Sequence, residues 1–136
     1  EVDQVRIFGN ANKTDSDGDG LPDWWEAAYG FATNAANGTN DPDNDRASNI
    51  DEYLADTSPI DSNSVFFIEA ISNQTGPLLS FQSSADRNYD IDWTESLTTG
   101  RWSNLQNNVE GTGDPITIID TNEAGQRVYR LKAIAP

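Results

Sequence analysis

The sequence predicts a mixed α+β protein with two parts, a pair of loop–helix units over residues 1–62 and a small antiparallel β-sandwich over residues 63–136. Three observations predict this division. An acidic pattern occurs twice, starting at Asp15 and again at Asp41. Each copy leads into a segment with apolar residues at helical spacing. From Ser64 onward the chain has short β-branched and aromatic runs between polar turns, which is typical of strands.

The first acidic segment, residues 15–26, has the spacing of a calcium-binding loop. Calcium takes about six to eight oxygens, which such a loop supplies from side chains at positions 1, 3, 5 and 9, a carbonyl at position 7 and a bidentate glutamate at position 12. The matching ligands are Asp15, Asp17, Asp19, Asp23, the carbonyl of Leu21, and Glu26. Without a cation the converging carboxylates would repel one another. The alternative is an acidic, solvated turn, since Asp and Gly are common in ordinary loops.

The second acidic segment, residues 41–52, repeats the register of the first. Its predicted ligands are Asp41, Asp43, Asp45, Asn49, the carbonyl of Ala47, and Glu52. Arg46 stands where the first copy has Gly20, and Asn49 replaces a carboxylate. A non-glycine residue in a left-handed conformation costs about 1–2 kcal/mol. We therefore expect a second calcium site with weaker or differently shaped coordination.

A short helix is expected after each loop. Apolar residues between positions 21 and 29 predict the first helix from about Pro22 to Tyr29, with the proline in the first turn, where it is tolerated. The same offset places Ala47, Ile50 and Leu54 on one face of the second unit. One short helix cannot bury its apolar face alone, so we expect the two units to pack on each other. Trp24 and Trp25 then belong mostly to the core.

The segments 15–31 and 41–59 resemble the bacterial type-3 thrombospondin repeats, which are related in their loops to dockerins and EF-hands and occur in secreted bacterial proteins. The resemblance covers about residues 12–61 and implies structural calcium binding. At loop position 8, where a regulatory EF-hand pairs a β-branched residue with its partner loop, this chain has Pro22 and Ser48. Proline has no N–H to offer. We therefore expect a static unit held together by calcium rather than a calcium sensor.

Composition excludes several classes of function. The net charge of −15 argues against binding nucleic acid or an anionic membrane surface. The chain has no cysteine and no histidine, which removes disulfides, thiol chemistry, the usual general base and the commonest zinc ligand. No apolar span of about 18 residues predicts membrane insertion. Loops of this kind suit extracellular calcium levels. We expect a secreted or cell-surface bacterial protein, with parent enzyme domains N-terminal to this fragment.

The C-terminal half has runs that predict five or six strands, at residues 65–68, 78–81, 89–93, 116–119 and 128–134. Polar turns are expected at 73–77, 84–88, 98–100 and 111–115. This spacing favours a small antiparallel sandwich or barrel. The half also resembles a C-terminal β module of secreted bacterial proteins, through Tyr89, Ile91, Trp93, Ser96, Leu97, Trp102, Tyr129, Arg130 and Leu131.

Four residues of this half are candidates for binding a polysaccharide. Exposed aromatic rings form flat platforms for sugar faces, and polar side chains read hydroxyl groups. The candidates are Trp102, Trp93, Tyr89 and Arg101. The alternative is core packing, which is favoured for Tyr89 and Trp93 because alternate residues of a strand share one face. For Trp102, which follows a Gly-Arg turn, the two roles are equally open.

Two hypotheses about function follow. No remaining acid pair or nucleophile–base arrangement has a recognisable catalytic pattern, so we expect no enzymatic activity. The first hypothesis is a noncatalytic, calcium-stabilised, carbohydrate-binding appendage of a secreted polysaccharide-degrading enzyme. The second is a structural spacer or a C-terminal sorting or anchoring module without a glycan ligand.

Overall fold

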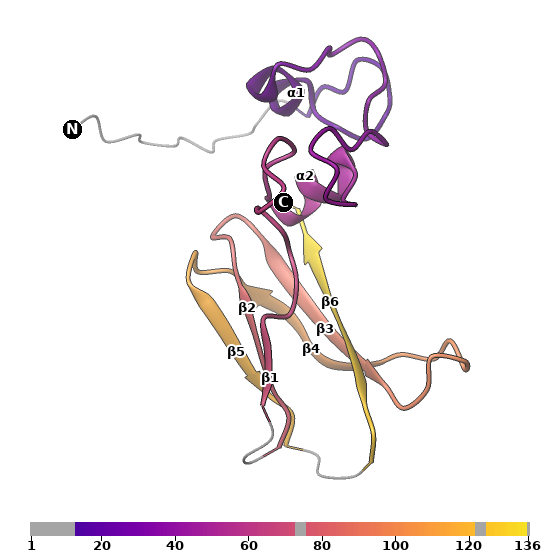
Figure 1. Ribbon diagram of the computed structural model, residues 1–136, viewed down its shortest axis with the longest axis vertical. Helices are drawn as coiled ribbons and strands as arrows, with labels where there is room; N and C mark the ends of the chain where they lie inside the picture. Colours follow the sequence, from indigo (N-terminus) through magenta and orange to yellow (C-terminus); the bar gives the residue numbers. More distant parts are fainter. Residues whose placement is uncertain (1–12, 73–75, 122–124, 136) are drawn as a thin grey trace, which may run out of the picture.

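A computed structural model describes residues 13–72, 76–121 and 125–135. Two short helices, α1 (Asp23–Tyr29) and α2 (Asn49–Ala55), precede six strands in this part of the chain. The strands are β1 (Ala70–Ser72), β2 (Leu78–Gln82), β3 (Asn88–Thr94), β4 (Ser103–Glu110), β5 (Pro115–Ile119) and β6 (Val128–Ile134). Figure 1 shows the helical unit seated on one end of the strands. The predicted α+β class and its order along the chain are confirmed.

The strands form two three-stranded antiparallel sheets. One has the order β1-β2-β5 and the other has the order β4-β3-β6. The core between them contains Phe81, Tyr89, Ile91 and Ile118, and Phe66 packs on it with its ring 5.7 Å from that of Tyr89. The arrangement is a small sandwich, in which alternate residues of β2 and β3 face inward.

Three details of the strand prediction are corrected. Residues 65–68 do not form a strand, since sheet pairing begins only where Glu69 N–H donates to the Ser80 carbonyl at 2.7 Å. The short strand β1 and the polar strand β4 were not predicted. In β4 a register shift and the positive φ of Asn108 (53°) break the alternation of apolar residues. The predicted turn at 73–77 lies partly outside the described residues.

Helix α1 follows the prediction within one residue. Pro22 is its N-cap, and Gly30, with φ of 77°, ends the helix in the left-handed conformation. Helix α2 begins with a capping box, in which the Ser48 hydroxyl accepts from Asp51 N–H and the Asp51 carboxylate accepts from Ser48 N–H. Ala47 precedes this box and therefore does not share the helical face predicted for it.

The two loop–helix units pack on each other through aromatic rings. Tyr53 of α2 lies 6.0 Å from the Trp25 ring and 6.3 Å from the Trp24 ring, both in edge orientations. Trp25 is buried at 4% exposure, whereas Trp24 is 41% exposed. The prediction that both tryptophans belong to the core is therefore corrected for Trp24. Successive residues of a helix point about 100° apart, so Trp24 and Trp25 cannot both point fully into the core, although both rings reach Tyr53.

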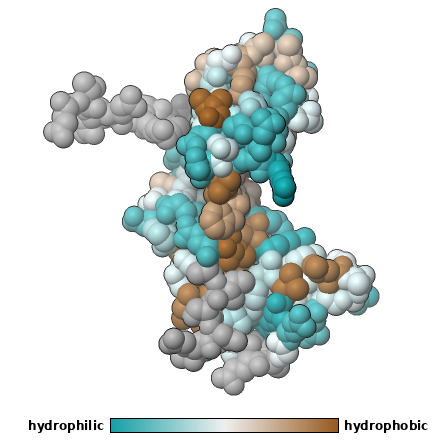
Figure 2. Space-filling model, in the orientation of Figure 1, coloured by the Kyte–Doolittle hydropathy of each residue, from teal (hydrophilic) through white to brown (hydrophobic). Residues whose placement is uncertain are grey.

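The helical unit and the sandwich are joined by Arg87. Its guanidinium donates to the carbonyls of Leu54 (2.9 Å) and Tyr53 (2.6 Å) in the last turn of α2 and lies 3.6 Å from the Asp56 carboxylate. Cations at a helix C-terminus are favourable because its carbonyls carry partial negative charge. Arg87 is itself buried. On the face drawn in Figure 2, hydrophobic residues gather near this junction and hydrophilic residues cover much of the helical unit.

Candidate metal centre

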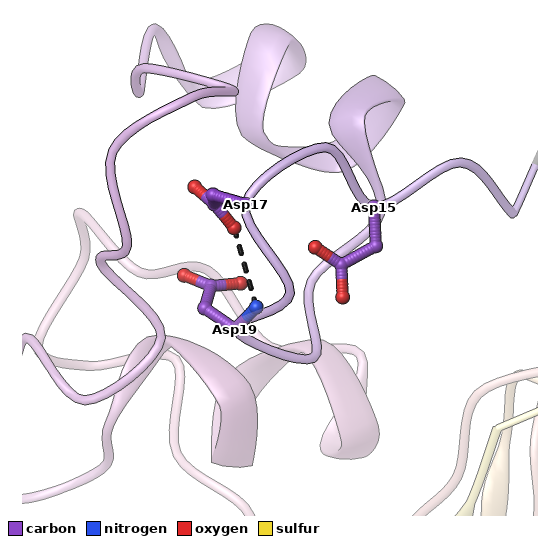
Figure 3. A group of neighbouring side chains, drawn as sticks. All are labelled: Asp15, Asp17 and Asp19. Atoms are coloured by element: carbon purple, nitrogen blue, oxygen red, sulfur yellow. Dashed lines mark hydrogen bonds between the residues drawn. The ribbon is translucent and has the colours of Figure 1, made fainter.

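The first acidic loop folds its three leading aspartates toward a common centre (Figure 3). One carboxylate oxygen from each of Asp15, Asp17 and Asp19 lies within 4.8 Å of the others. Gly18 and Gly20 have positive φ (76° and 96°) and donate their N–H groups to the Asp15 carboxylate at 2.7 and 3.0 Å. The Gly20 N–H, above all, lowers the pKa of Asp15. These main-chain donors favour the ionised form of Asp15, whereas burial raises the pKa of Asp17 in the same loop.

The second acidic loop has the same backbone without glycine. Asn44 and Arg46 take the positions of the two glycines with φ of 63° and 85°. The Arg46 N–H donates to Asp41 at 3.0 Å, as Gly20 does to Asp15. Carboxylate oxygens of Asp41, Asp43 and Asp45 again lie within 4.8 Å of one another. The expected left-handed conformation of Arg46 is confirmed, so this loop is built in spite of backbone strain.

Each loop is closed by a buried glutamate from the helix that follows it. Glu26 and Glu52 are both 0% exposed. Burial, reinforced by the neighbouring aspartates of the loop, raises the pKa of Glu26 and raises the pKa of Glu52 to about 7. The nearby Thr57 offsets this only in part, since neither carboxylate oxygen of Glu52 has a hydrogen-bond partner within 3.5 Å. Each glutamate therefore faces a group of like charges.

Buried oxygens without a hydrogen-bond partner are the main reason to consider a cation at these loops. In the part of the chain that the structure describes, they comprise one oxygen each of Asp17 and Glu26 in the first unit, and in the second unit one each of Asp41, Asp43, Asp45 and Asn49 with both of Glu52. A buried carboxylate oxygen without a donor is costly, and a cation is the partner that removes this cost. The donors are all oxygens, which fits a hard cation such as calcium.

The residues at position 9 of the two loops, Asp23 and Asn49, differ in their hydrogen bonds. Both carboxylate oxygens of Asp23 accept from Ser16, from its N–H at 2.8 Å and its hydroxyl at 2.7 Å. Asp23 thus lies outside the group of three aspartates, and its role as a ligand stays a prediction. Asn49, in contrast, keeps a buried side-chain oxygen without a partner. Both residues remain predicted ligands, and only Asn49 has a side-chain oxygen that is buried without a partner.

The two predicted main-chain ligands lie next to the clusters. Leu21 N–H donates to Asp19 at 2.9 Å, and Ala47 N–H donates to Asp45 at 2.7 Å. Each of these residues directly follows the turn that brings the aspartates together. Their carbonyl groups remain predicted ligands.

Sequence reasoning missed Asn37 and Gly38, which complete the first site from outside its loop. The Asn37 side-chain amide donates to Glu26 at 2.5 Å. The N–H groups of Asn37 and Gly38 both donate to one oxygen of Asp19, at 2.7 and 2.6 Å. A β-carbon on Gly38 would lie 2.9 Å from the Asp19 carbonyl, so only glycine fits. No loop pattern includes these positions; the Asn-Gly pair itself was the only available signal.

The proposed glycan-binding residues are not brought together in one site. Tyr89 is fully buried in the sandwich core, where its hydroxyl accepts from Ser84 N–H at 2.7 Å. It cannot offer a ring face to a sugar, which corrects its assignment as a ligand-binding residue. The ring of Trp93 is covered by Arg127 at 3.7 Å. Trp102 is partly exposed with Arg130 at 4.3 Å from its ring, and Arg101 beside it is exposed.

An ion-pair network lies on the face of β3 opposite to the core. Asp92 is held by Arg130 (2.8 Å), Lys132 (2.7 Å) and Asn104 (3.2 Å). Burial alone would raise the pKa of Asp92, but these three donors keep it below its usual range. The Asp92 carboxylate is therefore paired with Arg130 and Lys132 within the sheet. These bonds also hold the Arg130 side chain against the Trp102 ring.

Comparison of the chain with protein-family models, with curated proteins and with solved structures found no match. The resemblance to type-3 thrombospondin repeats therefore stays a prediction. Within the described residues, no helix is long and apolar enough to span a membrane.

Proposed function

We propose that this chain is a noncatalytic module whose helical part binds two calcium ions and is held in its fold by them. The observation that carries the proposal is the set of buried, unpartnered oxygens on Asp17, Glu26, Asp41, Asp43, Asp45, Asn49 and Glu52. Ordinary acidic turns leave their carboxylates in water. Here the two closing glutamates are entirely buried and face like charges. A divalent cation in each loop would balance that charge and supply the missing partners.

The donor set favours calcium over other metals. Zinc and copper sites are built from imidazole and thiolate ligands, and this chain has neither histidine nor cysteine. Magnesium requires near-octahedral geometry and usually keeps several waters. A bidentate glutamate, three aspartates and an amide or carbonyl oxygen suit the larger and more flexible shell of calcium.

The role we infer for the metal is structural. Helix α2 supplies Asn49 and Glu52 to the second loop and is fixed to the sandwich at its other end by Arg87. Because both ends of α2 are held, we infer a static unit rather than a sensor that changes shape when the metal binds. We infer that calcium sets the shape of a rigid appendage in a secreted bacterial protein.

The test is calorimetric titration of the whole chelator-treated chain with calcium chloride, with magnesium chloride in parallel. We expect two calcium ions per chain, much weaker magnesium binding, and a higher melting temperature in calcium. Each site stabilises the fold by about 4 kcal/mol when free calcium is 1,000 times its Kd. Absence of binding at millimolar calcium, or melting curves that coincide with and without chelator, would overturn the proposal.

A second candidate function, glycan binding by the sandwich, is favoured by one observation. Trp102 is partly exposed beside the exposed residues Arg101 and Asn104, with Arg130 positioned against its ring. Such a ring can stack on a sugar. The test is tryptophan fluorescence during titration with plant and algal polysaccharides in saturating calcium. A saturable change in fluorescence that Trp102→Ala abolishes and Trp24→Ala preserves would support glycan binding. If no polysaccharide changes the fluorescence, only the structural role remains.

A further inference from the structure

The second calcium loop carries more unsatisfied oxygens than the first. Among the described residues, six buried oxygens of the second unit have no partner, compared with two in the first. In the first unit, hydrogen bonds already occupy one oxygen of Glu26 and both oxygens of Asp19. The second loop therefore gains more from a cation, because a bound ion there supplies partners to more buried oxygens.

The hydrogen bonds that complete the first site come from a segment, residues 37–40, that is fixed to the second. The side-chain amide of Asn49 donates to the Asn37 carbonyl at 3.0 Å and to its side-chain oxygen at 3.2 Å. The main-chain N–H groups of Asn49 and Ile50 donate to the carbonyls of Asn40 (2.8 Å) and Gly38 (3.0 Å). The first turn of α2 thus holds this segment in place.

Asn37 stands at the centre of this connection. Its side-chain nitrogen donates to Glu26 of the first site, and its two oxygens accept from Asn49 of the second. Asn37 is 8% exposed and Asn49 is 0% exposed, so water does not readily replace either bond. A calcium ion that fixes Asn49 and Glu52 would also fix the donors that orient Glu26 and Asp19.

We infer that the two calcium sites are energetically coupled through Asn37, and that the second site fills first and prepares the first site for its ion. This inference rests on the proposed calcium-binding function. The coupling is reciprocal by thermodynamic necessity, so an ion in the first site strengthens the second by the same factor. Coupling between sites is typically about 5-fold to 150-fold in affinity.

The test measures each site in the absence of the other, by calcium chloride titration of the full chain. Glu52→Gln leaves the first site intact, and Glu26→Gln leaves the second. We expect each variant to bind one ion, with the remaining site about 10-fold weaker than its counterpart in the unaltered chain, within the range quoted above. The unaltered chain should show positive cooperativity. In the single-site variants, the second site should bind more tightly than the first.

Asn37→Ala is the critical variant, because it removes the side-chain bonds and keeps the main-chain ones. Asn34→Ala makes the same change at an exposed position of the connection between α1 and α2 and serves as the matched control. We expect Asn37→Ala to bind two ions with clearly reduced cooperativity, since the main-chain bonds between the sites remain, and Asn34→Ala to behave like the unaltered chain. If Asn37→Ala does not fold, the two glutamine variants still decide the question.

The outcomes separate the inference from the function it rests on. Two ions bound independently, with unchanged affinity at the site left in each glutamine variant, would overturn the coupling and leave the calcium-binding proposal standing. Tighter binding at the first site would overturn the order of filling. No calcium binding by the unaltered chain would refute the proposed function itself.

Discussion

The two acidic loops have nearly the same backbone but differ in how their charge is balanced. Gly18 and Gly20 in the first loop, and Asn44 and Arg46 in the second, all have positive φ. The first loop receives N–H donors from residues 37 and 38, whereas the second keeps six buried oxygens without partners. The loop with the better sequence match is therefore the one with fewer buried oxygens left without a partner. The types of ligand residue alone do not predict which loop gains more from a cation. Hydrogen-bond donors from other segments change how many ligand oxygens of each loop lack a partner.

The two helices also differ in what holds their ends. Helix α1 ends on Gly30, which closes it with local main-chain bonds to Ala27 and Glu26. Helix α2 ends on Asp56, which is left-handed without being glycine (φ of 62°), and its last carbonyls are bonded by Arg87 from the sandwich. The second unit is therefore part of the junction, and the first is attached through it.

Arg87→Ala tests this unequal attachment and has the largest expected effect. It leaves two helix carbonyls and the Asp56 carboxylate without their cation, at a cost of about 3 kcal/mol. Chemical denaturation should show this loss, and amide exchange should rise more in α2 than in α1. Arg101→Ala, which removes an exposed arginine, should stay within about 0.5 kcal/mol of the unaltered chain. Equal exchange in both helices would contradict the comparison.

Replacing each closing glutamate by glutamine tests the difference in charge balance. In chelator, Glu52→Gln should stabilise the chain by about 1–3 kcal/mol, because it removes a buried charge that has no partner. Glu26→Gln should gain less, since Asn37 already donates to Glu26. In saturating calcium both variants should be less stable than the unaltered chain. Thermal melts in chelator and in calcium check that the effect of each substitution on stability changes sign. Equal stabilisation by the two substitutions in chelator would contradict the difference between the loops.

The pH dependence of the calcium-free chain should follow Glu52. Its pKa is about 7 in the fold, compared with 4.5 for an ordinary glutamate, so the folded state binds more protons between these values. Stability from this group is complete below pH 4.5 and is lost as pH rises through about 7. Calcium affinity should increase over the same range, because the ion displaces the proton. Denaturation at several pH values, with Glu52→Gln as the control that loses the slope, measures this effect.

Exchange of the turn residues has the smallest expected effect. Arg46→Gly should stabilise the second loop by about 1 kcal/mol and tighten its calcium site, since it removes left-handed strain. Gly20→Ala should destabilise the first loop, where φ is 96° and the new β-carbon would lie 2.7 Å from the Ile50 side chain. Calorimetry on both variants checks the pair. Weaker calcium binding by Arg46→Gly would show that the arginine side chain contributes more than its backbone strain costs.

Local patterns in the sequence predicted the parts of the molecule that depend on neighbouring residues. The register of the two loops, the left-handed Arg46 and helix α1 all follow from spacing within about twelve residues. The buried face of β3 follows from the alternation of Tyr89 and Ile91. In each case the deciding contacts are close in the chain.

The parts that the sequence did not predict depend on distant contacts. Asn37 completes the first site from eleven residues beyond Glu26, and nothing in the loop pattern refers to it. Arg87 is bonded to carbonyls 33 and 34 residues earlier, as a buried arginine in a stretch predicted to be a polar turn. Strand β4 was missed because its side chains are mostly polar and its bulge interrupts the period of two.

The bonds of Arg87 have a consequence for the module under mechanical load. The covalent connection from α2 to β1 runs through residues 56–69, fourteen in all, which could extend to about 45 Å if pulled straight. Arg87 bridges the same junction directly, so a stretching force must break its bonds to Tyr53 and Leu54 before this length is released. Arg87 therefore resists extension of this linker and keeps the two halves at a fixed spacing until its hydrogen bonds to α2 break.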